Sequence, residues 1–359
     1  MPQADPELSV VVLAGGIGSR FWPASTPARP KQLLPLASPR SLIRDTVERA
    51  LALVPADRLK ILAGGHLVPP FRRELEGLGD DAFWGEPRAR GTGPVLAWAA
   101  HRIAREHPEA VMVSLHSDHF IDPTDAFREV ILRGARIAAQ TGALVTVAVP
   151  PDRPETGFGY IRMGDPLSEG EEGYQVAAFI EKPDAPTARR YVEAGYLWNS
   201  GIFIWSASRF LEEVRLHAPE IGDHLHLLDQ DREEEFFQTV PAISVDEAVL
   251  ERSGRVGTVP ATFRWDDLGS WDALSRTRTP DDDGNVVEGE AYLTESRGNV
   301  VWAEDGPVAM FGVEDLVVAR AAGVTLVAPR NRAGELKRLI ARLPESLRDR
   351  PPRAPEGDE

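Results

Sequence analysis

Residues 8–36 read LSVVVLAGGIGSRFWPASTPARPKQLLPL, and they combine a strand pattern with a glycine loop. The first six residues are rich in β-branched side chains and predict a buried strand. Gly15, Gly16 and Gly18 follow it directly, where backbone N–H groups can approach phosphate oxygens without a Cβ in the way. The stretch therefore predicts a strand that ends in an anion-binding loop.

Two familiar phosphate-binding patterns do not fit this loop. The dinucleotide-binding pattern requires a third glycine where Phe21 stands, and the P-loop requires Gly-Lys-Ser/Thr where Ser19 and Arg20 stand. What remains is a loop that contains Arg20, with Lys31 further along beyond three prolines. The prolines stiffen the segment, so Lys31 can return to the loop at low entropic cost. Arg20 and Lys31 can neutralise a triphosphate together; the alternative is a tight turn with surface cations.

Outward from this loop, the first half of the chain alternates strand and helix patterns. Strands are predicted over residues 8–13, 59–63, 110–115 and 143–149. Helices are predicted over residues 41–54, 92–105 and 123–139. This alternation is typical of an α/β fold with a mostly parallel sheet that is covered on both faces. Ligands bind such sheets at the carboxyl ends of the strands.

The second half follows a looser pattern. Residues 174–180 and 201–205 read as strands, and a helical stretch runs from residue 207 to about 250. The turn cluster DDDGN marks a boundary, beyond which short alternating runs and a last amphipathic helix follow. We therefore expect three parts: a catalytic domain over 1–280, a small β appendage over 281–344 and a flexible tail over 345–359.

The composition excludes several classes of protein. Of the 359 residues, 42% are hydrophobic and 27% are charged, as in ordinary globular enzymes. A net charge of −16 argues against nucleic acid as the main partner. No apolar run approaches the roughly 20 residues that a membrane helix needs, and the first residues do not form a signal peptide. The absence of cysteine excludes thiolate chemistry and suits the cytoplasm.

Two aspartates are candidates for a metal site. Asp118 follows the predicted strand AVMVSL, where a carboxylate is well placed for Mg²⁺. A zinc site at His116 and His119 lacks an evident third ligand, and a solvated turn is the other alternative. Asp267 lies in WDDLGSW, where it can bind a metal or cap a helix that begins near Ser270.

Three further motifs have the residue types of a sugar-phosphate site. Gly157 lies in the glycine-rich run ETGFGY, Glu181 and Lys182 lie in EKP, and Asn199 lies in WNSG. Lys182 is one of only four lysines in the chain, and a lysine suits phosphate while glutamate and asparagine suit hydroxyl groups. The alternative is an ordinary turn for ETGFGY, a surface ion pair for EKP, and for WNSG an asparagine that only turns the chain.

The motif LAGGIGSRFWPASTPARPKQLLPL resembles the signature of the sugar-1-phosphate nucleotidyltransferases, and most closely that of mannose-1-phosphate guanylyltransferases. The resemblance extends over nearly the whole chain. It implies a Rossmann-like, doubly wound mixed sheet with a short left-handed β-helix-like appendage that helps to form dimers. Many bacterial relatives also carry a fused isomerase domain of the cupin type; this sequence stops before one, so we expect the single-activity form.

The resemblance also implies roles for individual residues. Asp118 and Asp267 match the family's two Mg²⁺ ligands, and Arg20 and Lys31 match its catalytic cations. The sugar 1-phosphate would be bound by Gly157, Glu181, Lys182 and Asn199. The nucleotide would be bound by Ala14, Gly15, Gly16, Gly18, Ser19, Arg90 and Thr92. One departure concerns the base: residues 90–94 read RGTGP where the family usually has Arg-Asn-Thr-Ala-Pro.

Together with the residues, the resemblance implies a cytoplasmic, Mg²⁺-dependent enzyme that works by direct in-line displacement; the choice of GTP and mannose 1-phosphate as substrates rests on the resemblance. We expect a homodimer that binds neither nucleic acid nor membranes. Two alternatives remain open: a glucose-1-phosphate uridylyl- or thymidylyltransferase, and a non-catalytic subunit that senses nucleotide sugars. A dehydrogenase is disfavoured because the dinucleotide-binding pattern fails.

Overall fold

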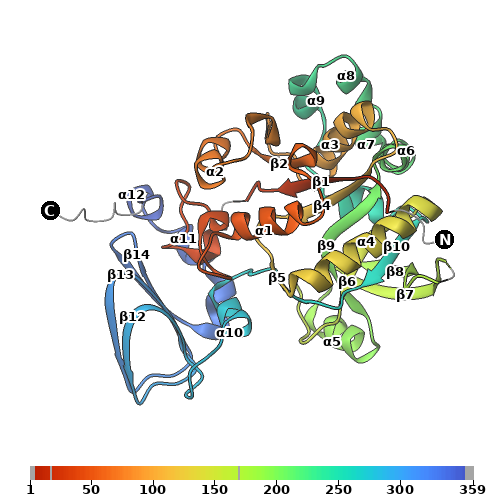
Figure 1. Ribbon diagram of the computed structural model, residues 1–359. Helices are drawn as coiled ribbons and strands as arrows, with labels where there is room; N and C mark the ends of the chain where they lie inside the picture. Colours follow the sequence, from red (N-terminus) through yellow and green to blue (C-terminus); the bar gives the residue numbers. More distant parts are fainter. Residues whose placement is uncertain (1–4, 17, 169, 352–359) are drawn as a thin grey trace. The chain divides into compact units, whose positions relative to one another are not determined.

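The computed structural model describes residues 5–16, 18–168 and 170–351 (Figure 1). Its contacts divide the chain into two compact units. Unit 1 comprises Met1–Gly15, Thr46–His116 and Ile121–Trp265. Unit 2 comprises Gly16–Asp45, Ser117–Phe120 and Asp266–Glu359. The expected domain boundary is a single position in the chain, residue 281. The contacts instead place the segment 16–45 in the same unit as the C-terminal part.

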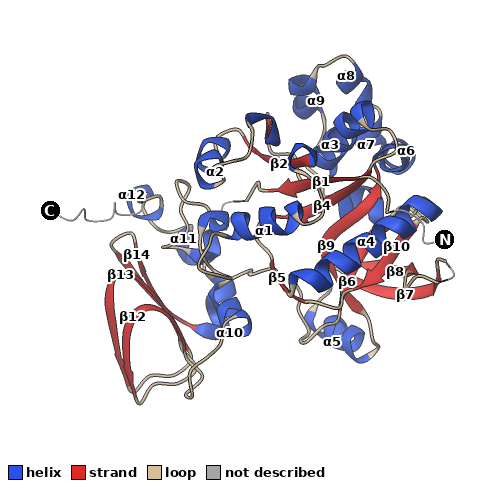
Figure 2. Ribbon diagram, viewed as in Figure 1, coloured by secondary structure: helices blue, strands red, loops and turns tan. Residues whose placement is uncertain are grey.

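A nine-stranded mixed sheet forms the centre of unit 1 (Figure 2). Its strand order is β3-β2-β1-β4-β9-β6-β10-β8-β7. The strands are β1 (Leu8–Leu13), β2 (Leu59–Gly64), β3 (Phe83–Glu86), β4 (Val111–His116), β6 (Leu144–Val149), β7 (Tyr160–Pro166), β8 (Tyr174–Ile180), β9 (Leu197–Ser206) and β10 (Val256–Pro260). The four strands β1 to β4 are parallel, but β9 runs antiparallel to both of its neighbours, β4 and β6. The expected mostly parallel sheet is therefore mixed.

Helices cover both faces of this sheet. The helices of unit 1 are α2 (Val68–Glu74), α3 (Thr92–Glu106), α4 (Thr124–Thr141), α5 (Ala185–Glu193), α6 (Ala207–His217), α7 (Pro219–Gly222), α8 (Leu225–Asp229) and α9 (Glu233–Thr239). Helix α4 packs on β6, β9 and β10, and α3 packs on α6 over the face that presents Phe203 and Trp205. Side chains alternate along a strand, so Ile204 points to the face of the sheet opposite to that of Phe203 and Trp205. Helix α4 covers that face, and its Gly134 packs so closely on Ile204 that an added Cβ would meet it.

The predicted helical stretch over 207–250 is broken into short pieces. Helices α6 to α9 follow one another with turns between them, and a π-helical turn over Asp246–Leu250 ends the stretch. Pro219 begins α7, because proline fits the first turn of a helix but not its interior. Phe236 and Phe237 of α9 are fully buried.

A cluster of aromatic rings forms the core of unit 2. Trp271 lies 5.0 Å from Phe21 and 5.5 Å from Trp302 between ring centroids, and its indole N–H donates to the carbonyl oxygen of Trp22. Short helical turns frame this core: η1 (Ser19–Phe21), η2 (Lys31–Leu33), η6 (Trp271–Ala273), α10 (Leu274–Thr277), η7 (Arg330–Glu335), α11 (Lys337–Ile340) and α12 (Glu345–Arg348). These contacts explain why the segment 16–45 belongs to the same unit as the C-terminal part.

The predicted β appendage is a four-stranded sheet within unit 2. It consists of β12 (Val286–Thr294), β13 (Val300–Phe311), β14 (Leu316–Ala321) and β15 (Val324–Pro329). The pairs β12–β13 and β13–β14 are parallel, and β14–β15 is an antiparallel hairpin. Asn285 and Asn299 are buried and hydrogen-bonded to each other and to the turns between the strands. Parallel coils with buried asparagines at their turns are consistent with a β-helix-like element.

Three elements lie where the chain passes from one unit to the other in sequence: α1 (Leu42–Leu51), β5 (Phe120–Asp122) and β11 (Arg264–Asp266). Within the predicted tail, Glu345–Arg348 forms α12, and Trp22 donates its indole N–H to the carbonyl oxygen of Arg348. The rest of the tail, from residue 352, lies outside the described residues. Among the described helices, none has the length and apolarity to cross a membrane.

Candidate active site

The conformation of the glycine loop depends on Gly18. This residue has φ +70° and ψ +42°, which glycine adopts readily. A Cβ at Gly18 would lie 2.2 Å from Cβ of Lys31, far inside any normal contact. Lys31 therefore returns to the loop, as its place beyond the prolines predicts. The predicted Ser19 and Arg20 are half-buried in the turn η1 that follows, and residue 17 lies outside the described part of the chain.

The other predicted nucleotide-binding positions differ in what they offer. Gly15 and Gly16 are exposed, but Ala14 is fully buried and its N–H donates to the carbonyl oxygen of Leu62. The N–H of Ala14 is thus already used inside the sheet. The amide of Gln32 donates to the carbonyl oxygen of Gly16 at 2.8 Å. Gln32 stands next to Lys31 and was not among the predicted site residues.

The structure brings Lys31 together with the two predicted metal ligands, all within unit 2. The ammonium of Lys31 donates to Oδ2 of Asp118 at 2.9 Å and to the backbone carbonyl oxygen of Asp267 at 2.7 Å. It also lies 5.7 Å from the ring centroid of Phe21. Only 6% of the Lys31 side chain is exposed, so this cation is fixed in place. We call Lys31, Asp118 and Asp267 the lysine–aspartate group.

The adjacent carboxylates of Asp266 and Asp267 have different surroundings. Asp266 is buried and pairs with Arg276, whose Nε and Nη2 reach its two carboxylate oxygens at 2.8 and 3.3 Å. Asp266 also accepts the N–H of Leu268 at 2.8 Å. The carboxylate of Asp267 accepts the N–H of Gly269 at 3.0 Å, and the following turn η6 has no side-chain cap. The helix-cap alternative for Asp267 is therefore wrong.

The electrostatic environment of Asp267 differs from that of an ordinary surface aspartate. Burial raises the pKa of its carboxyl group. The positive charges of Lys31 and Arg20 lower that pKa, and the negative charges of Asp266 and Asp118 raise it. Because the carboxylates oppose one another, a further cation near them would be favourable.

The donor atoms of the lysine–aspartate group fit a hard divalent cation. Two carboxylates and one backbone carbonyl are oxygen ligands of the kind that Mg²⁺ prefers. The ammonium of Lys31 between an oxygen of Asp118 and the carbonyl of Asp267 shows that these oxygens already stabilise a positive charge. The chemistry of the group therefore fits a magnesium ion.

The predicted sugar-phosphate residues lie in unit 1, where backbone bonds join their three segments. The N–H of Lys182 donates to the carbonyl of Phe158, and the N–H of Asn199 donates to the carbonyl of Gly159. A Cβ at Gly159 would lie 2.7 Å from Oε2 of Glu181, so glycine allows this close approach. The predicted Gly157 is exposed, and its N–H donates to Glu155. The structure therefore places the ETGFGY, EKP and WNSG motifs side by side.

Lys182 and Glu181 form an ion pair at the surface of this region. Their charged atoms are 2.6 Å apart, and 62% of the Lys182 side chain is exposed. The pKa of Lys182 is raised, first by the hydrogen bond to Glu181. Lys182 also has φ +45°, an uncommon conformation for a residue with a side chain. Backbone strain of this kind often occurs at functional positions. An ordinary surface ion pair would not explain the strain at Lys182.

The amide of Asn199 is held from both sides. It lies inside β9, so the chain-reversing alternative is wrong. Its Oδ1 accepts from the hydroxyl of Thr146 at 2.7 Å and from the backbone N–H of Gly201 at 3.3 Å. Its Nδ2 donates to Oδ1 of Asp246 at 2.9 Å. Because the Gly201 N–H can only donate, the amide has a single orientation, with its N–H groups directed away from Thr146.

Asp246 is a member of this group that sequence reasoning missed. It lies in the stretch SVDEAVLE, which showed only a helical pattern and gave no local signal of function. Burial raises its pKa to about 7, and the charge of Glu181 adds to this rise. We call Glu181, Lys182, Asn199 and Asp246 the lysine–asparagine group.

Arg90 and Thr92 hold the start of α3 to the segment that follows α9. The guanidinium of Arg90 donates to the carbonyls of Phe237 and Gln238 at 2.7 and 3.0 Å. The hydroxyl oxygen of Thr92 accepts the N–H of Val245 at 2.9 Å. Both predicted nucleotide-binding side chains are therefore engaged with backbone groups.

The glycine that departs from the family pattern has a structural reason. Gly91 has φ +77° and ψ 178°, a region that is almost restricted to glycine. A Cβ there would lie 2.6 Å from the carbonyl oxygen of Ile243. An asparagine at this position would require the backbone of this chain to change.

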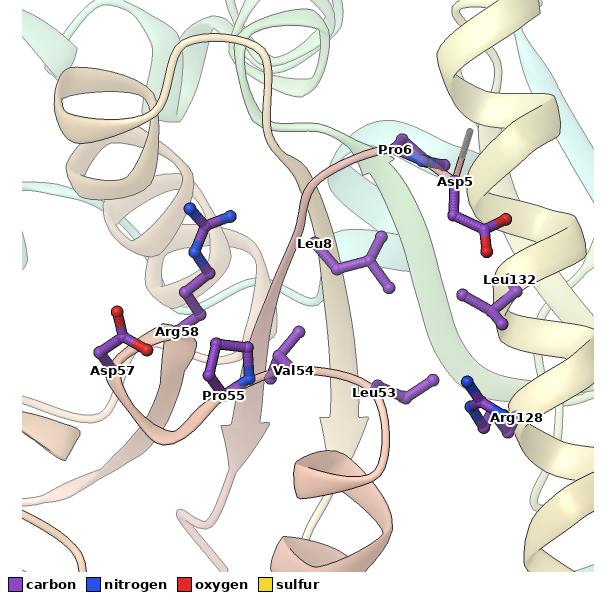
Figure 3. Close-up of a pocket in the computed structure, with 10 residues that line it drawn as sticks. All are labelled: Asp5, Pro6, Leu8, Leu53, Val54, Pro55, Asp57, Arg58, Arg128 and Leu132. Atoms are coloured by element: carbon purple, nitrogen blue, oxygen red, sulfur yellow. The ribbon is translucent and has the colours of Figure 1, made fainter. Parts of the chain in front are cut away.

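A cavity of about 410 Å³ opens elsewhere in unit 1, at the start of β1 (Figure 3). Its lining comprises Asp5, Pro6, Leu8, Leu53, Val54, Pro55, Asp57, Arg58, Arg128 and Leu132. None of the predicted site residues lines it. It lies at the amino end of β1, whereas ligands of parallel sheets bind at the carboxyl ends of the strands.

Comparisons with known proteins agree with the fold and the motifs. Residues 9–283 match the family model described as Nucleotidyl transferase, so the chain belongs to the nucleotidyl transferase family. Residues 289–343 match the model described as MannoseP isomerase/GMP-like beta-helix domain, which agrees with the parallel strands of the appendage. The recognised family and the predicted fold class are confirmed.

Individual relatives sharpen this result. The chain is 37% identical to the mannose-1-phosphate guanylyltransferase of Escherichia coli, over 95% of this chain and 74% of that one. It is 36% identical to the mannose-1-phosphate guanylyltransferase ManC of Salmonella typhimurium, over 94% and 73%. The crystal structure described as mannose-1-phosphate geranyltransferase from Thermus thermophilus has 34% identity and a TM-score of 0.87, with 94% of this chain and 99% of that one covered.

Proposed function

We propose that this protein transfers GMP from GTP to mannose 1-phosphate. A phosphate oxygen of mannose 1-phosphate attacks the α-phosphorus of GTP, the bond from that phosphorus to the bridging oxygen breaks, and GDP-mannose and pyrophosphate form. Relatives whose names state mannose-1-phosphate guanylyltransferase cover 95% and 94% of the chain. The lysine–aspartate group is the observation that carries the proposal, because it joins a buried cation to the Asp118 carboxylate and to the backbone carbonyl of Asp267.

The reaction needs positioning and charge neutralisation rather than a protein nucleophile. Lys31 and Arg20 would bind the triphosphate and the departing pyrophosphate. Gly15, Gly16, Gly18 and Ser19 would allow the nucleotide phosphates to approach the backbone. The close packing of Lys31 on Gly18 supports this assignment, because it places the lysine at the glycine loop.

Asp118 and Asp267 would hold Mg²⁺. When bound, this ion neutralises phosphate charge and orients the reacting oxygens. Lys31 is hydrogen-bonded to both residues, so its ammonium would act on the same phosphates as the ion. We assign Asp267 rather than Asp266, because Arg276 donates to both carboxylate oxygens of Asp266.

Glu181, Lys182 and Asn199 of the lysine–asparagine group would bind mannose 1-phosphate, together with Gly157. Lys182 would donate to the phosphate, and Glu181 and Asn199 would bind sugar hydroxyls. For the nucleotide, we propose that Arg90 and Thr92 act by fixing the start of α3, because their side chains are bonded to neighbouring backbone groups. We also propose a cytoplasmic homodimer; sedimentation of the purified protein would test the dimer.

Pyrophosphate release tests the proposed function. The purified protein is assayed with and without Mg²⁺ across GTP, UTP and dTTP paired with mannose 1-phosphate or glucose 1-phosphate. We expect release to be fastest with GTP and mannose 1-phosphate and to require the metal. Preference for UTP or dTTP with glucose 1-phosphate would contradict the substrates, and a folded protein that releases nothing from any pair would contradict catalysis.

A further inference from the structure

The structure leaves Asp246 without a role in the proposed reaction, although its place in the lysine–asparagine group is well defined. It accepts a hydrogen bond from Asn199 at 2.9 Å and lies at the first position of the π-helical turn Asp246–Leu250. π-helical turns are rare and often occur at functional sites. The residue that caps the start of this turn is Val245, which makes no side-chain hydrogen bond.

The hydrogen bonds of Asn199 show what Asp246 does to the amide. Thr146 and the Gly201 N–H occupy its oxygen, and Asp246 occupies one of its two N–H groups. One N–H remains for a ligand. Toward the sugar phosphate, Asn199 can therefore only donate a hydrogen bond, and its partner must be an acceptor oxygen of the ligand.

The charged groups near Asp246 belong to the EKP loop and to its own segment. The negative charge of Glu181 in that loop raises the pKa of Asp246, Glu247 is the next residue of the π-helical turn, and Glu251 follows the end of the turn. Lys182 is the cation whose charge stabilises the carboxylate of Asp246. An added negative charge at Asp246 both attracts Lys182 and repels an incoming phosphate, so it works against the binding of a sugar phosphate.

We propose that Asp246 is a positioning residue for the sugar phosphate, which orients the amide of Asn199 and whose charge controls the affinity of the lysine–asparagine group for its anionic ligand. This inference rests on the proposed function, because it takes a sugar 1-phosphate as the ligand. It requires no contact between Asp246 and the reacting atoms.

The direction of the pH effect follows from the raised pKa of about 7. Below this pH, Asp246 is protonated and neutral, and its carbonyl oxygen can still accept from Asn199. Above it, the carboxylate is charged and opposes the phosphate. The KM for the sugar phosphate should therefore rise as the pH increases from about 6.5 to about 8.5.

The substitution Asp246→Asn separates the charge of Asp246 from its hydrogen bond. Asp246→Asn keeps an acceptor but removes the charge, so its KM for mannose 1-phosphate at about pH 8.5 should be roughly threefold to tenfold lower than that of the parent protein. The ratio of the two KM values should approach one at about pH 6.5. The substrate's own titration cancels in this ratio, because both proteins receive the same substrate. Turnover should stay within about twofold, since the residue acts on binding rather than on chemistry.

The hydrogen bond is tested from the other side of the amide. Thr146→Val removes the hydroxyl that holds Asn199 and should raise the KM while the pH dependence persists. Asp246→Ala should raise the KM at about pH 6.5, where the parent carboxyl group is neutral. Glu193→Gln, at the exposed end of α5, removes one negative charge of unit 1 and is the matched control.

Direct titration calorimetry of mannose 1-phosphate into each folded variant distinguishes this inference from the proposed function. If Asp246→Asn shows the pH profile of the parent protein, the inference is wrong while the function stands. If Thr146→Val and Asp246→Ala bind as tightly as the parent, the positioning role is wrong. If the parent binds mannose 1-phosphate but releases no pyrophosphate with any nucleotide, the proposed catalysis fails separately.

Discussion

Lys31 in unit 2 and Lys182 in unit 1 form ion pairs of similar length in very different surroundings. Lys31 lies 2.9 Å from Asp118 with 6% of its side chain exposed, and Lys182 lies 2.6 Å from Glu181 with 62% exposed. Lys31 has a second acceptor in the carbonyl of Asp267, which fixes its direction. An exposed pair contributes only about 0–1 kcal/mol, so Lys182 can leave Glu181 for a ligand at little cost.

From this difference we expect a division of labour between the two lysines in the proposed reaction. A cation that is held in place before the substrate arrives suits charge neutralisation during the reaction. A cation that can change its partner suits the binding and release of a substrate. Each group also depends on a glycine, Gly18 for Lys31 and Gly159 for Glu181, because a side chain there would occupy the space of its neighbour.

The largest effect is expected from Asp267→Asn. We expect turnover to fall by roughly 10²–10³-fold, because the substitution removes one of the two carboxylates proposed to hold the metal. The free energy of unfolding should change little, since the Gly269 N–H can still be accepted by the amide oxygen. Initial rates of pyrophosphate release at saturating substrates measure the effect.

Asp266→Asn is the matched control for this substitution. It weakens the pairing with Arg276, so it should lower the free energy of unfolding by about 1–2 kcal/mol while turnover stays within about tenfold. Urea unfolding measures the stability of both variants. Equal losses of turnover in the two variants would contradict the distinction between these adjacent aspartates.

A smaller effect on stability should separate the two lysines. Lys31→Met leaves Asp118 beside a neutral side chain, and we expect the free energy of unfolding to fall by about 2 kcal/mol. Lys182→Met removes an exposed charge and should change it by less than about 0.5 kcal/mol. Lys337→Met, on the exposed surface of α11, is the control within unit 2. The comparison between the two lysines fails if Lys182→Met is the more destabilising.

The smallest difference is expected between the two glycines. Gly18→Ala places a Cβ against the Cβ of Lys31 in a left-handed conformation, and it should destabilise the protein by about 1–3 kcal/mol. At Gly159 the obstructing atom is the far end of Glu181, which can rotate away, so we expect a loss below about 1 kcal/mol and a raised sugar-phosphate KM. Thermal unfolding and steady-state kinetics measure the pair. The reverse order of destabilisation would show that Lys31 moves more readily than its packing indicates.

Much of the fold was predictable because its signals are local. The run LSVVVL forms β1 at the predicted residues, and Thr92 begins the predicted helix α3. The antiparallel direction of β9 was not predictable, because a strand pattern contains no information about the direction of its neighbours. The helical stretch from residue 207 to about 250 was predicted without its internal boundaries, and turns such as the one before Pro219 divide it.

The site shows the same contrast between local and distant signals. Gly18 and Lys31 stand in a recognisable pattern, and their contact follows from the stiff segment between them. The difference between Asp266 and Asp267 depends on Arg276, which no motif connects to them. Asp246 is 47 residues from Asn199 in the chain, so only the folded structure reveals their hydrogen bond. Gly91 stands where the family usually has an asparagine, and the backbone conformation of this residue explains the glycine.

Parallel steady-state kinetics of Lys31→Met and Lys182→Met test the division of labour most directly. Both variants are assayed for pyrophosphate release at saturating GTP with varied mannose 1-phosphate. We expect Lys31→Met to lower kcat by roughly 10²-fold or more with KM changed less than about threefold, and Lys182→Met to raise KM by about tenfold or more with kcat nearly unchanged. If both substitutions change the same parameter, or if neither changes the rate, the two groups do not divide the reaction in this way.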